Sequence, residues 1–442
     1  MILNVNFVKA ELVHIDNGPL TQVKTQYNNS YEYLRFYKNL IVWEQFIDPN
    51  DKVRIYNLST NLETNVSQYN SNQNGPYIWE NNIVWRDDRN YNKSDYNHYD
   101  IIMMDLKNNK EELITYSMMS EESRQQIHGN YILYASYNFS VKEYALMLYN
   151  IKSKNTTKIL NNTSSLNWDY DHTTVSKTLN GEFVLIPSKN ESNQMIDIYL
   201  YEIKTGLFNK IFSLENNTMR TSFFINERYV VWRNSYYYYD LVLRKLIKLN
   251  NKTPIGISSI YKDKIVFGYD ISIEDLLIIE VFNLSTGNLY TIQIPHTMGG
   301  DTIYFPQIYG NKIIFRFRVI DSFHERLYIY NLSWDTDFDG TPDYMDEDDD
   351  NDGYNDTIEI EEDSIIWGNT SIPQDFDLDL IPDSTDPDDD NDGYLDDEDK
   401  YPLDPTKWKK EEEEGKGFIP GFEFIFLLIS ILLIWLHRKN YE

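Results

Sequence analysis

The chain has 442 residues, with 70 acidic and 40 basic side chains and a formal net charge of −30 at pH 7. It contains no cysteine, which excludes disulfides, thiol catalysis and cysteine-ligated zinc. Tyrosine is abundant, and no segment before residue 418 keeps the apolar period of a helix. We therefore expect an all-β protein.

The first 334 residues contain a weak unit that recurs in series. Each unit is a short apolar run, a polar turn and a second run, and Gly, Asn or Asp separates the runs. The spacing of roughly 35 to 52 residues is that of propeller blades, and closure into one ring needs no second domain. The seven paired runs are Leu40–Trp43 with Val53–Leu58, Ile83–Trp85 with Tyr99–Leu106, Tyr131–Tyr134 with Tyr144–Ile151, Phe183–Ile186 with Ile196–Ile203, Tyr229–Trp232 with Tyr236–Leu243, Ile265–Phe267 with Leu276–Leu284, and Ile313–Phe315 with Leu327–Leu332.

These units resemble the repeats of TolB-type propellers, which have six to eight blades. The best match is the segment WRDDRN (Trp85–Asn90) followed by YDIIMMDL (Tyr99–Leu106). The resemblance implies a β-propeller over residues 1–334, and the count of units predicts seven blades. The last unit lacks an outer strand, so we expect the alternating stretch Val5–Ile15 to supply it and to close the ring.

No catalytic motif for a metalloprotease, a serine hydrolase or a nucleotide-binding enzyme is found in the chain. The seven histidines are scattered without metal-ligand spacing. The segment Asp87–Arg89 is either a carboxylate pair or ordinary turn chemistry, and Tyr236–Tyr239 is either a sugar platform or partly core. Two hypotheses remain: a binding or interaction module without catalytic activity, or an extracellular hydrolase or lyase that acts on polysaccharide or peptide.

Four acidic loops follow the repeats. Each places carboxylates at positions 1, 3, 5, 9 and 12 of a twelve-residue window, the spacing at which calcium loops present hard oxygen ligands. Three loops have Gly at position 6, where the chain turns sharply, and the third has Leu380, so we expect it to bind most weakly. The predicted Ca²⁺ ligands are Asp335, Asp337, Asp339, Asp343 and Asp346; Asp348, Asp350, Asp352, Asp356 and Glu359; Asp375, Asp377, Asp379, Asp383 and Asp386; and Asp388, Asp390, Asp392, Asp396 and Asp399.

The loops resemble thrombospondin type 3 repeats, which are calcium-filled loops with little secondary structure. The cysteines of the animal repeats are absent, so the resemblance implies that metal alone cross-links residues 335–399. This segment holds 28 acidic residues and no Lys or Arg, which leaves the rest of the chain nearly neutral. Because the negative charge is confined to these loops, we expect no nucleic-acid partner and no role as a nucleic-acid mimic.

The C-terminal region has the composition of a membrane anchor. A charged linker, residues 400–417, precedes an apolar stretch of about 19 residues, near the minimum for a span, and basic residues follow it. The positive-inside rule then places the C-terminus in the cytoplasm and the bulk outside the cell. Pro420–Phe422 with this stretch resembles the PGF-CTERM sorting signal of archaeal surface proteins. The resemblance implies that an archaeosortase cleaves the segment 418–442 and attaches a lipid.

The N-terminal residues lack the pattern of a signal peptide. Either the true start is missing, or the protein is tail-anchored with its bulk in the cytosol. We favour export, because calcium loops of this kind need extracellular calcium and because glycosylation sequons are frequent. The sequence therefore predicts a glycosylated cell-surface protein with an unknown glycan or protein ligand; examples of the sequons are Asn57, Asn138, Asn190, Asn283 and Asn331.

Overall fold

A computed structural model describes residues 8–9, 11–14, 18–25, 31–91, 98–116, 120–161, 178–190, 195–215, 222–233, 235, 237–249, 257–271, 276–294, 302–318, 325–362, 364–368 and 370–408. The chain divides into two compact units, Met1–Asp350 and Asn351–Glu442. The predicted segment 418–442 lies outside the described residues. In the part of the chain that the structure describes, no helix has both the length and the apolar character needed to cross a membrane.

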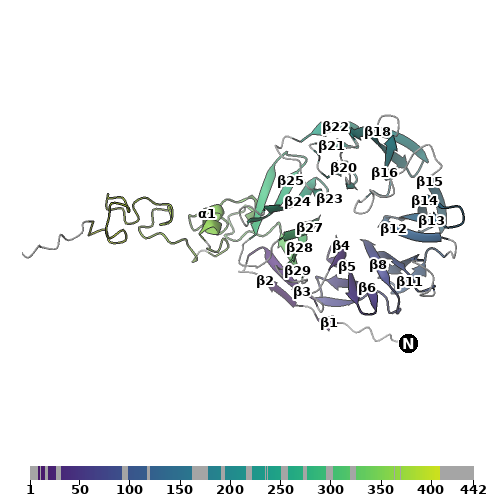
Figure 1. The fold of residues 1–442 in the computed structure, drawn as a ribbon, viewed down its shortest axis with the longest axis horizontal. Helices are drawn as coiled ribbons and strands as arrows, with labels where there is room; N and C mark the ends of the chain where they lie inside the picture. The colour runs from purple at the N-terminus through teal and green to yellow at the C-terminus, as the bar shows by residue number, and fades with distance from the viewer. Residues whose placement is uncertain are drawn as a thin grey trace, which may run out of the picture. The chain divides into compact units, whose positions relative to one another are not determined.

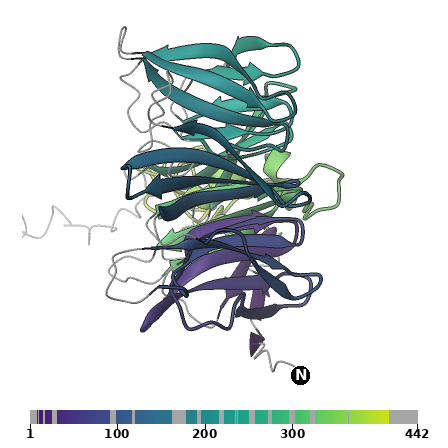
Figure 2. The same cartoon turned by 90° about the vertical axis from the view of Figure 1, so that its right-hand side faces the viewer.

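The first unit is a ring of seven antiparallel sheets, which confirms the predicted seven-bladed propeller (Figure 1). The seven pairs of runs predicted from the sequence form the two middle strands of the seven blades. These strands are rich in β-branched and aromatic residues and are buried on both faces, which explains why they could be recognised. Figure 2 shows the blades from the side, with their strands running between the two faces of the ring.

The strands of each blade follow one another in chain order from the centre of the ring outward. Blade 1 is β4 (Glu32–Tyr37), β5 (Leu40–Ile47), β6 (Asn50–Asn57) and β7 (Leu62–Asn65). Blade 2 is β8 (Gln73–Trp79), β9 (Asn82–Asp87), β10 (Asp100–Asp105) and β11 (Lys110–Leu113). Blade 3 is β12 (Ser120–His128), β13 (Tyr131–Asn138), β14 (Glu143–Asn150) and β15 (Asn155–Asn161). Blade 4 is β16 (Phe183–Asn190), β17 (Met195–Glu202) and β18 (Leu207–Glu215), and a single bridge from Leu179 to Val184 lies on its inner side.

The remaining blades keep the same order. Blade 5 is β19 (Phe223–Ile225), β20 (Tyr229–Trp232), β21 (Tyr237–Asp240) and β22 (Lys245–Lys248). Blade 6 is β23 (Ile257–Tyr261), β24 (Lys264–Ile271), β25 (Leu276–Asn283) and β26 (Leu289–Ile294). Blade 7 takes β27 (Thr302–Tyr309), β28 (Lys312–Arg318) and β29 (Glu325–Asn331) from the end of the propeller sequence.

The N-terminal segment completes blade 7, but the closing strand is not the one predicted. The strand that pairs with β29 is β3 (Leu20–Lys24), whereas the described residues of Val5–Ile15 form β1 (Val8–Lys9) and β2 (Glu11–His14) at sheet edges. Strand β2 pairs with β3 on its outer side, and β1 pairs with β7 of blade 1. The alternating pattern of Val5–Ile15 suggested the wrong strand because the decisive feature is burial: Leu20 and Val23 are buried in the core.

The hydrophobic core lies between neighbouring blades. The cluster that joins blade 7 to blade 1 contains Val23 of β3, Trp43 of β5 and Leu327 of β29, so the two ends of the propeller sequence share one core. An equivalent cluster between blades 1 and 2 contains Trp85. Further clusters join blades 2 and 3, blades 3 and 4, blades 4 and 5, and blades 5 and 6, so apolar burial between neighbouring blades stabilises the ring.

The second unit has little secondary structure. Its one described helix, α1 (Asp356–Glu361), begins after Asn355, whose side chain accepts a hydrogen bond from the Thr357 N–H. The short 3-10 helix η3 (Asp343–Met345) belongs to the first unit, where the Tyr344 ring lies 5.3 Å from that of Tyr290 on β26. The first acidic loop therefore packs on blade 6.

Candidate functional sites

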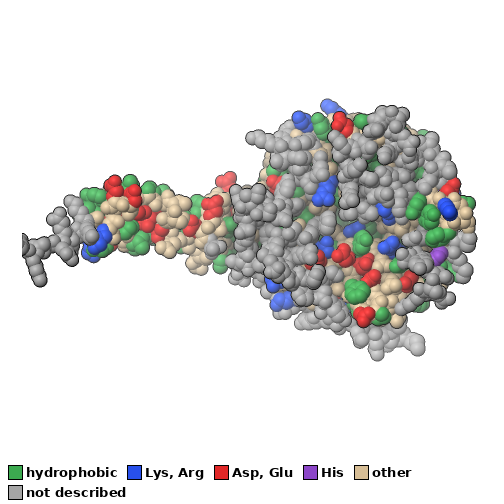
Figure 3. Space-filling view, viewed as in Figure 1, with side chains coloured by type: hydrophobic (Ala, Val, Ile, Leu, Met, Phe, Trp, Pro, Cys, Tyr) green, Lys and Arg blue, Asp and Glu red, His purple; other side chains and the backbone are tan. Residues whose placement is uncertain are grey.

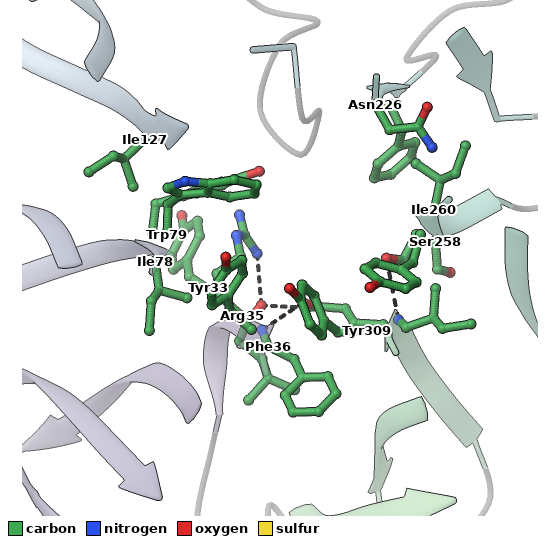
Figure 4. A pocket seen from close by; sticks show the side chains of 18 of the residues that line it. Tyr33, Arg35, Phe36, Ile78, Trp79, Ile127, Asn226, Ser258, Ile260 and Tyr309 are labelled. Atoms are coloured by element: carbon green, nitrogen blue, oxygen red, sulfur yellow. Dashed lines mark hydrogen bonds between the residues drawn. The ribbon is translucent and has the colours of Figure 1, made fainter. Parts of the chain in front are cut away.

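The innermost strands of the propeller enclose a cavity of about 510 Å³ at the centre of the ring. Its walls come from β4, β8, β12, β19, β23, β27 and β28, and aromatic and aliphatic side chains predominate among them (Figure 4). A largely apolar cavity with a few polar groups is the usual form of a small-ligand site. The cavity is therefore the first candidate site.

One end of this cavity is ringed by residues that occupy the same place in every blade. Each residue directly precedes the tight turn between the first and second strands, and the first turn residue often has a positive φ, as at Lys38, Glu80 and Lys262. Asparagine, glycine and aspartate in these turns supply the required backbone conformations. We call this set the turn ring; its members are Tyr37, Trp79, His128, Asn180, Asn226, Tyr261 and Tyr309.

Aromatic contacts hold the first part of the turn ring together. The Tyr309 ring lies 4.5 Å from Tyr261 and 4.7 Å from Tyr37, and Tyr37 lies 5.0 Å from Trp79. Trp79 in turn contacts His128, with 3.5 Å between the ring centroids. Burial is the main cause that raises the pKa values of Tyr37 and Tyr309 above their usual range, so both hydroxyls stay protonated near neutral pH.

Amide groups continue the turn ring through blades 4 and 5. The Asn180 side chain donates a hydrogen bond of 2.8 Å to the Asn226 carbonyl, and the Asn226 side chain donates one of 2.6 Å to the Lys262 carbonyl. Gly181 has a φ of +88° and no room for a side chain, because a Cβ there would lie 2.7 Å from His128 Nδ1. The turn ring thus consists mainly of aromatic and amide side chains, several of which contact a neighbouring blade.

The innermost strands are irregular where they face the cavity. Register shifts occur in β4, β8, β12, β23 and β27, and bulges of this kind redirect side chains. In the first three strands the irregularity includes a residue with positive φ: Tyr33 (+48°), Gly75 (+60°) and Arg124 (+55°). Glycine adopts this conformation without strain, whereas a tyrosine does not. Strained residues of this kind cluster at functional sites, so Tyr33 supports the cavity as a candidate site.

Side chains of glutamine fix these irregular strands to their neighbours. Gln307 of β27 accepts a hydrogen bond of 3.1 Å from the Phe36 N–H and also donates one to the Leu34 carbonyl. Gln126 of β12 accepts a hydrogen bond of 2.9 Å from the Thr178 N–H. The cavity wall is therefore cross-linked between blades by buried hydrogen bonds, which keep it rigid.

The candidates that the sequence suggested within the propeller have structural roles. Asp87 accepts hydrogen bonds from the Trp85 indole (2.9 Å) and the Arg89 guanidinium (2.6 Å), and Asp88 binds Asn72. They therefore serve as turn and core anchors and do not line the cavity. In the Tyr236–Tyr239 segment, two of the described side chains, Tyr238 and Tyr239, are buried, and only Tyr237 is exposed. The residues that line the cavity escaped sequence analysis, because they lie on polar, irregular strands with no motif.

The acidic loops form the second candidate site. In each loop the carboxylates of positions 1, 3 and 5 offer oxygens within 4.8 Å of one another, so each group could bind a metal ion. The four groups are Asp335, Asp337 and Asp339; Asp348, Asp350 and Asp352; Asp375, Asp377 and Asp379; and Asp388, Asp390 and Asp392. Figure 3 shows acidic side chains distributed along this part of the chain.

The four loops share one backbone conformation. Residues at positions 4 and 6 all have positive φ, and the residue at position 6 includes Leu380 at +75°. The N–H of position 6 donates to the position 1 carboxylate, with distances of 3.1 Å at Gly340, 2.9 Å at Leu380 and 2.9 Å at Gly393. The third loop therefore keeps the geometry of the others in spite of its leucine, at the cost of a strained backbone.

The fourth loop contains buried carboxylate oxygens that have no hydrogen-bond partner among the described residues. At positions 1, 3, 5 and 12, one oxygen of each side chain is buried and accepts no hydrogen bond from a described residue. Leaving charged oxygens buried and unbonded is costly, and a cation removes that cost. These four residues are Asp388, Asp390, Asp392 and Asp399.

The position 9 carboxylates are placed differently. Asp343, Asp383 and Asp396 accept hydrogen bonds of 2.9, 2.7 and 3.0 Å from the N–H of position 2 in their own loops. None of them belongs to the groups of positions 1, 3 and 5. Burial raises the pKa of Asp343 to about 6. In these three loops the position 9 carboxylate is therefore hydrogen-bonded to the loop backbone. Its role as an ion ligand stays a prediction.

Comparison with known proteins adds support for the fold. No protein-family model matches the chain, and no curated protein matches it. Among solved structures, an oligogalacturonate lyase in complex with manganese has a TM-score of 0.52 and 12% identity, and the similarity covers 74% of this chain and 97% of that chain. At this identity the similarity shows a common propeller fold alone.

Two further solved structures are propellers of lower similarity. The β-propeller domain of the Trilobed protease from Pyrococcus furiosus, described as having an open velcro topology, has a TM-score of 0.48 at 12% identity, covering 69% of this chain and 95% of that chain. TolB from Acinetobacter baumannii has a TM-score of 0.35 at 14% identity, covering 66% of this chain and 79% of that chain.

Proposed function

We propose that this protein is a calcium-binding cell-surface protein whose propeller binds a ligand in its central cavity. The observation that carries the binding function is the cavity itself: about 510 Å³, walled by aromatic rings from several blades and braced by hydrogen bonds between blades. Rigid aromatic walls bind ligands at little entropic cost, because few side chains must be ordered.

The binding function is tested by screening the full-length protein, in calcium, against glycan and peptide arrays. A hit is then measured by calorimetry with the wild type and with Trp79→Ala, which removes one wall of the cavity. We expect Trp79→Ala to abolish binding of the hit. Equal binding by both proteins would place the ligand elsewhere, and a screen without any hit would count against the binding function.

Calcium is the cation that we propose for the acidic loops. The support comes from ligand chemistry: all candidate side chains are carboxylates on alternate residues, a set that suits a hard cation with high coordination number. Calcium should cross-link the loops into a spacer between the propeller and the membrane. Dissociation constants of about 0.1–1 mM are expected, the range of extracellular modules.

The membrane anchor rests on the sequence of residues 418–442 alone. Mass spectrometry of the native protein decides its fate: a lipid-bearing end near Pro420–Phe422 supports sorting, and a peptide that extends intact to Glu442 supports a retained span. Protease treatment of whole cells tests the outward orientation, since a propeller that survives shaving would favour the cytosolic, tail-anchored alternative.

A hydrolase or lyase is the second candidate function, and one observation favours it. His128 Nε2 lies 3.9 Å from a carboxylate oxygen of Glu227 at the turn ring, and Glu227 is 68% exposed. A histidine beside a carboxylate is a common acid–base arrangement. Turnover of any array hit that is lost in both His128→Gln and Glu227→Gln would establish this function in place of simple binding.

A further inference from the structure

The central cavity is lined by two arginines with different surroundings, Arg35 and Arg316. Arg54 binds Glu63, Arg89 binds Asp87 and Glu111, and Arg316, which also lines the cavity, lies 3.0 Å from Glu325. This is the expected state, because a buried cation without a carboxylate partner is destabilising. Arg35 on β4, which is half-buried and lines the cavity, lacks such a partner among the described residues.

Arg35 makes only partial use of its guanidinium group. One nitrogen, Nη1, donates a hydrogen bond of 2.8 Å to the Leu34 carbonyl, and the guanidinium carbon lies 4.7 Å from the centre of the Tyr77 ring. The Nε–H is buried and has no hydrogen-bond partner among the described residues. No carboxylate of the described part of the chain forms an ion pair with Arg35. The guanidinium group of Arg35 is thus held in place, and its Nε–H remains available to donate a hydrogen bond.

Hydrogen bonds to a neighbouring blade and aromatic side chains surround Arg35. Gln307 accepts a hydrogen bond from the Phe36 N–H and donates one to the Leu34 carbonyl, so the residues on either side of Arg35 are bonded to β27. In Figure 4 Arg35 lies on the same side of the cavity as Tyr33 and Trp79. The strained Tyr33 is 45% exposed. A planar guanidinium with free donors matches a carboxylate, and flanking aromatic faces match a flat apolar body.

We propose that the cavity binds an organic carboxylate carried on a flat apolar framework, with Arg35 as the group that binds the carboxylate. The proposal rests on the binding function proposed above and specifies its ligand class. Two sources present this chemistry: a free aromatic acid, and the C-terminus of a peptide that ends in an aromatic residue.

Calorimetry on the full-length chain in calcium tests the proposal with matched probe pairs. Indole-3-acetate and indole-3-acetamide represent the free acid; N-acetyl-Gly-Trp and its C-terminal amide represent the peptide. Each pair differs only in the carboxylate. We expect at least one acid to bind about tenfold more tightly than its amide, the effect of one charge-assisted pair. The pair that shows the difference identifies the source.

Variants then assign the discrimination to Arg35. In Arg35→Gln the acid and its amide should bind equally well, and in Arg35→Lys the preference for the acid should be reduced but present. Lys38→Gln is the matched control, since Lys38 is exposed and is not among the residues that line the cavity, and its loss removes the same charge. That variant should keep the tenfold preference. Melting temperatures of all variants show whether the fold is intact.

Three results would overturn the proposal: no preference for either acid in the wild type, a preference that persists in Arg35→Gln, or an equal loss in Lys38→Gln. If Arg35→Gln fails to fold, Arg35→Lys supplies the comparison with the wild type. A failure here leaves the binding function standing as long as an array hit depends on Trp79. The absence of both array hits and probe binding would remove the binding function itself.

Discussion

The two units of the chain are stabilised by opposite kinds of side chain. In the propeller, buried apolar residues fill the space between blades, and buried charges such as Arg54 and Glu63 are paired with each other. In the second unit few large apolar side chains are buried, among them Tyr354 and Trp367, while Asp390 and Asp399 are buried carboxylates. We therefore expect burial of apolar side chains to be enough to fold the first region, and a cation to be needed to balance the charge of the second.

Removal of calcium should therefore have the largest effect, and it should act on the acidic loops rather than on the propeller blades. We expect the isolated segment 335–408 to lose its ordered structure in excess chelator, because like charges then repel without compensation. The propeller should keep its melting temperature to within a few degrees under the same conditions. Circular dichroism of the two pieces measures both. A segment that is equally ordered with and without 10 mM calcium would contradict the comparison, since that concentration exceeds the expected dissociation constants of about 0.1–1 mM.

Deletion of the closing strand should have the next largest effect, and it should act on the propeller alone. Removing residues 1–24 deletes β3 with the buried Leu20 and Val23, and it exposes the edge of β29. We expect this variant to aggregate or to unfold at least 10 °C earlier, since the lost burial is worth about 3–5 kcal/mol. Removing residues 1–16 deletes only the edge strands β1 and β2.

The shorter deletion is thus the matched control for the role of β3. It should lower the melting temperature by only a few degrees, because β1 pairs over two residues and β2 leaves β3 in place. Equal damage from the two deletions would mean that the outer strands, rather than β3, close the ring.

The sequence revealed the middle strands of every blade because their composition is almost purely apolar, as in Ile83–Trp85 and Ile265–Phe267. The same reasoning could not find the innermost strands. Tyr33–Arg35 alternates poorly and contains a left-handed residue, because Leu34 packs in the core while Tyr33 and Arg35 line the cavity. Sequence patterns therefore predict the frame of this fold better than its candidate binding site.

The sequons show a related limit of sequence analysis. Asn57, Asn138, Asn283 and Asn331 each accept a hydrogen bond from the N–H two residues later in a turn. An Asn followed two positions later by Ser is common turn chemistry, which provides a structural reason for these sequons. Glycosylation of these asparagines stays a prediction, because their role in the turns alone accounts for the sequence pattern.

A single ligand change within the fourth loop should affect one site only. Asp392→Ala removes the position 5 carboxylate, whose buried oxygen has no hydrogen-bond partner among the described residues. We expect calorimetry to show one calcium ion fewer per chain, or one site weakened more than about tenfold. Asp397→Ala removes an exposed carboxylate at position 10 and should leave every site intact. Equal effects of the two variants would show that total charge, and not the loop geometry, attracts the calcium. Asp352→Ala, which removes position 5 of the second loop, should likewise cost one site.

The smallest expected effect concerns the strain in the third loop. At position 4 the second and fourth loops have Asn351 and Asn391, whereas the third has Leu378, and all three residues have positive φ. Asparagine adopts this conformation more readily than leucine, and Leu378 is 65% exposed, so little packing is lost when it is replaced. We expect Leu378→Asn to stabilise the calcium-loaded segment by about 0.5–1 kcal/mol in urea unfolding. Leu378→Ala is the control, because it removes the apolar side chain and keeps a Cβ at a left-handed position. If the alanine variant gains as much as the asparagine variant, the leucine side chain and not its backbone conformation is the source of the strain.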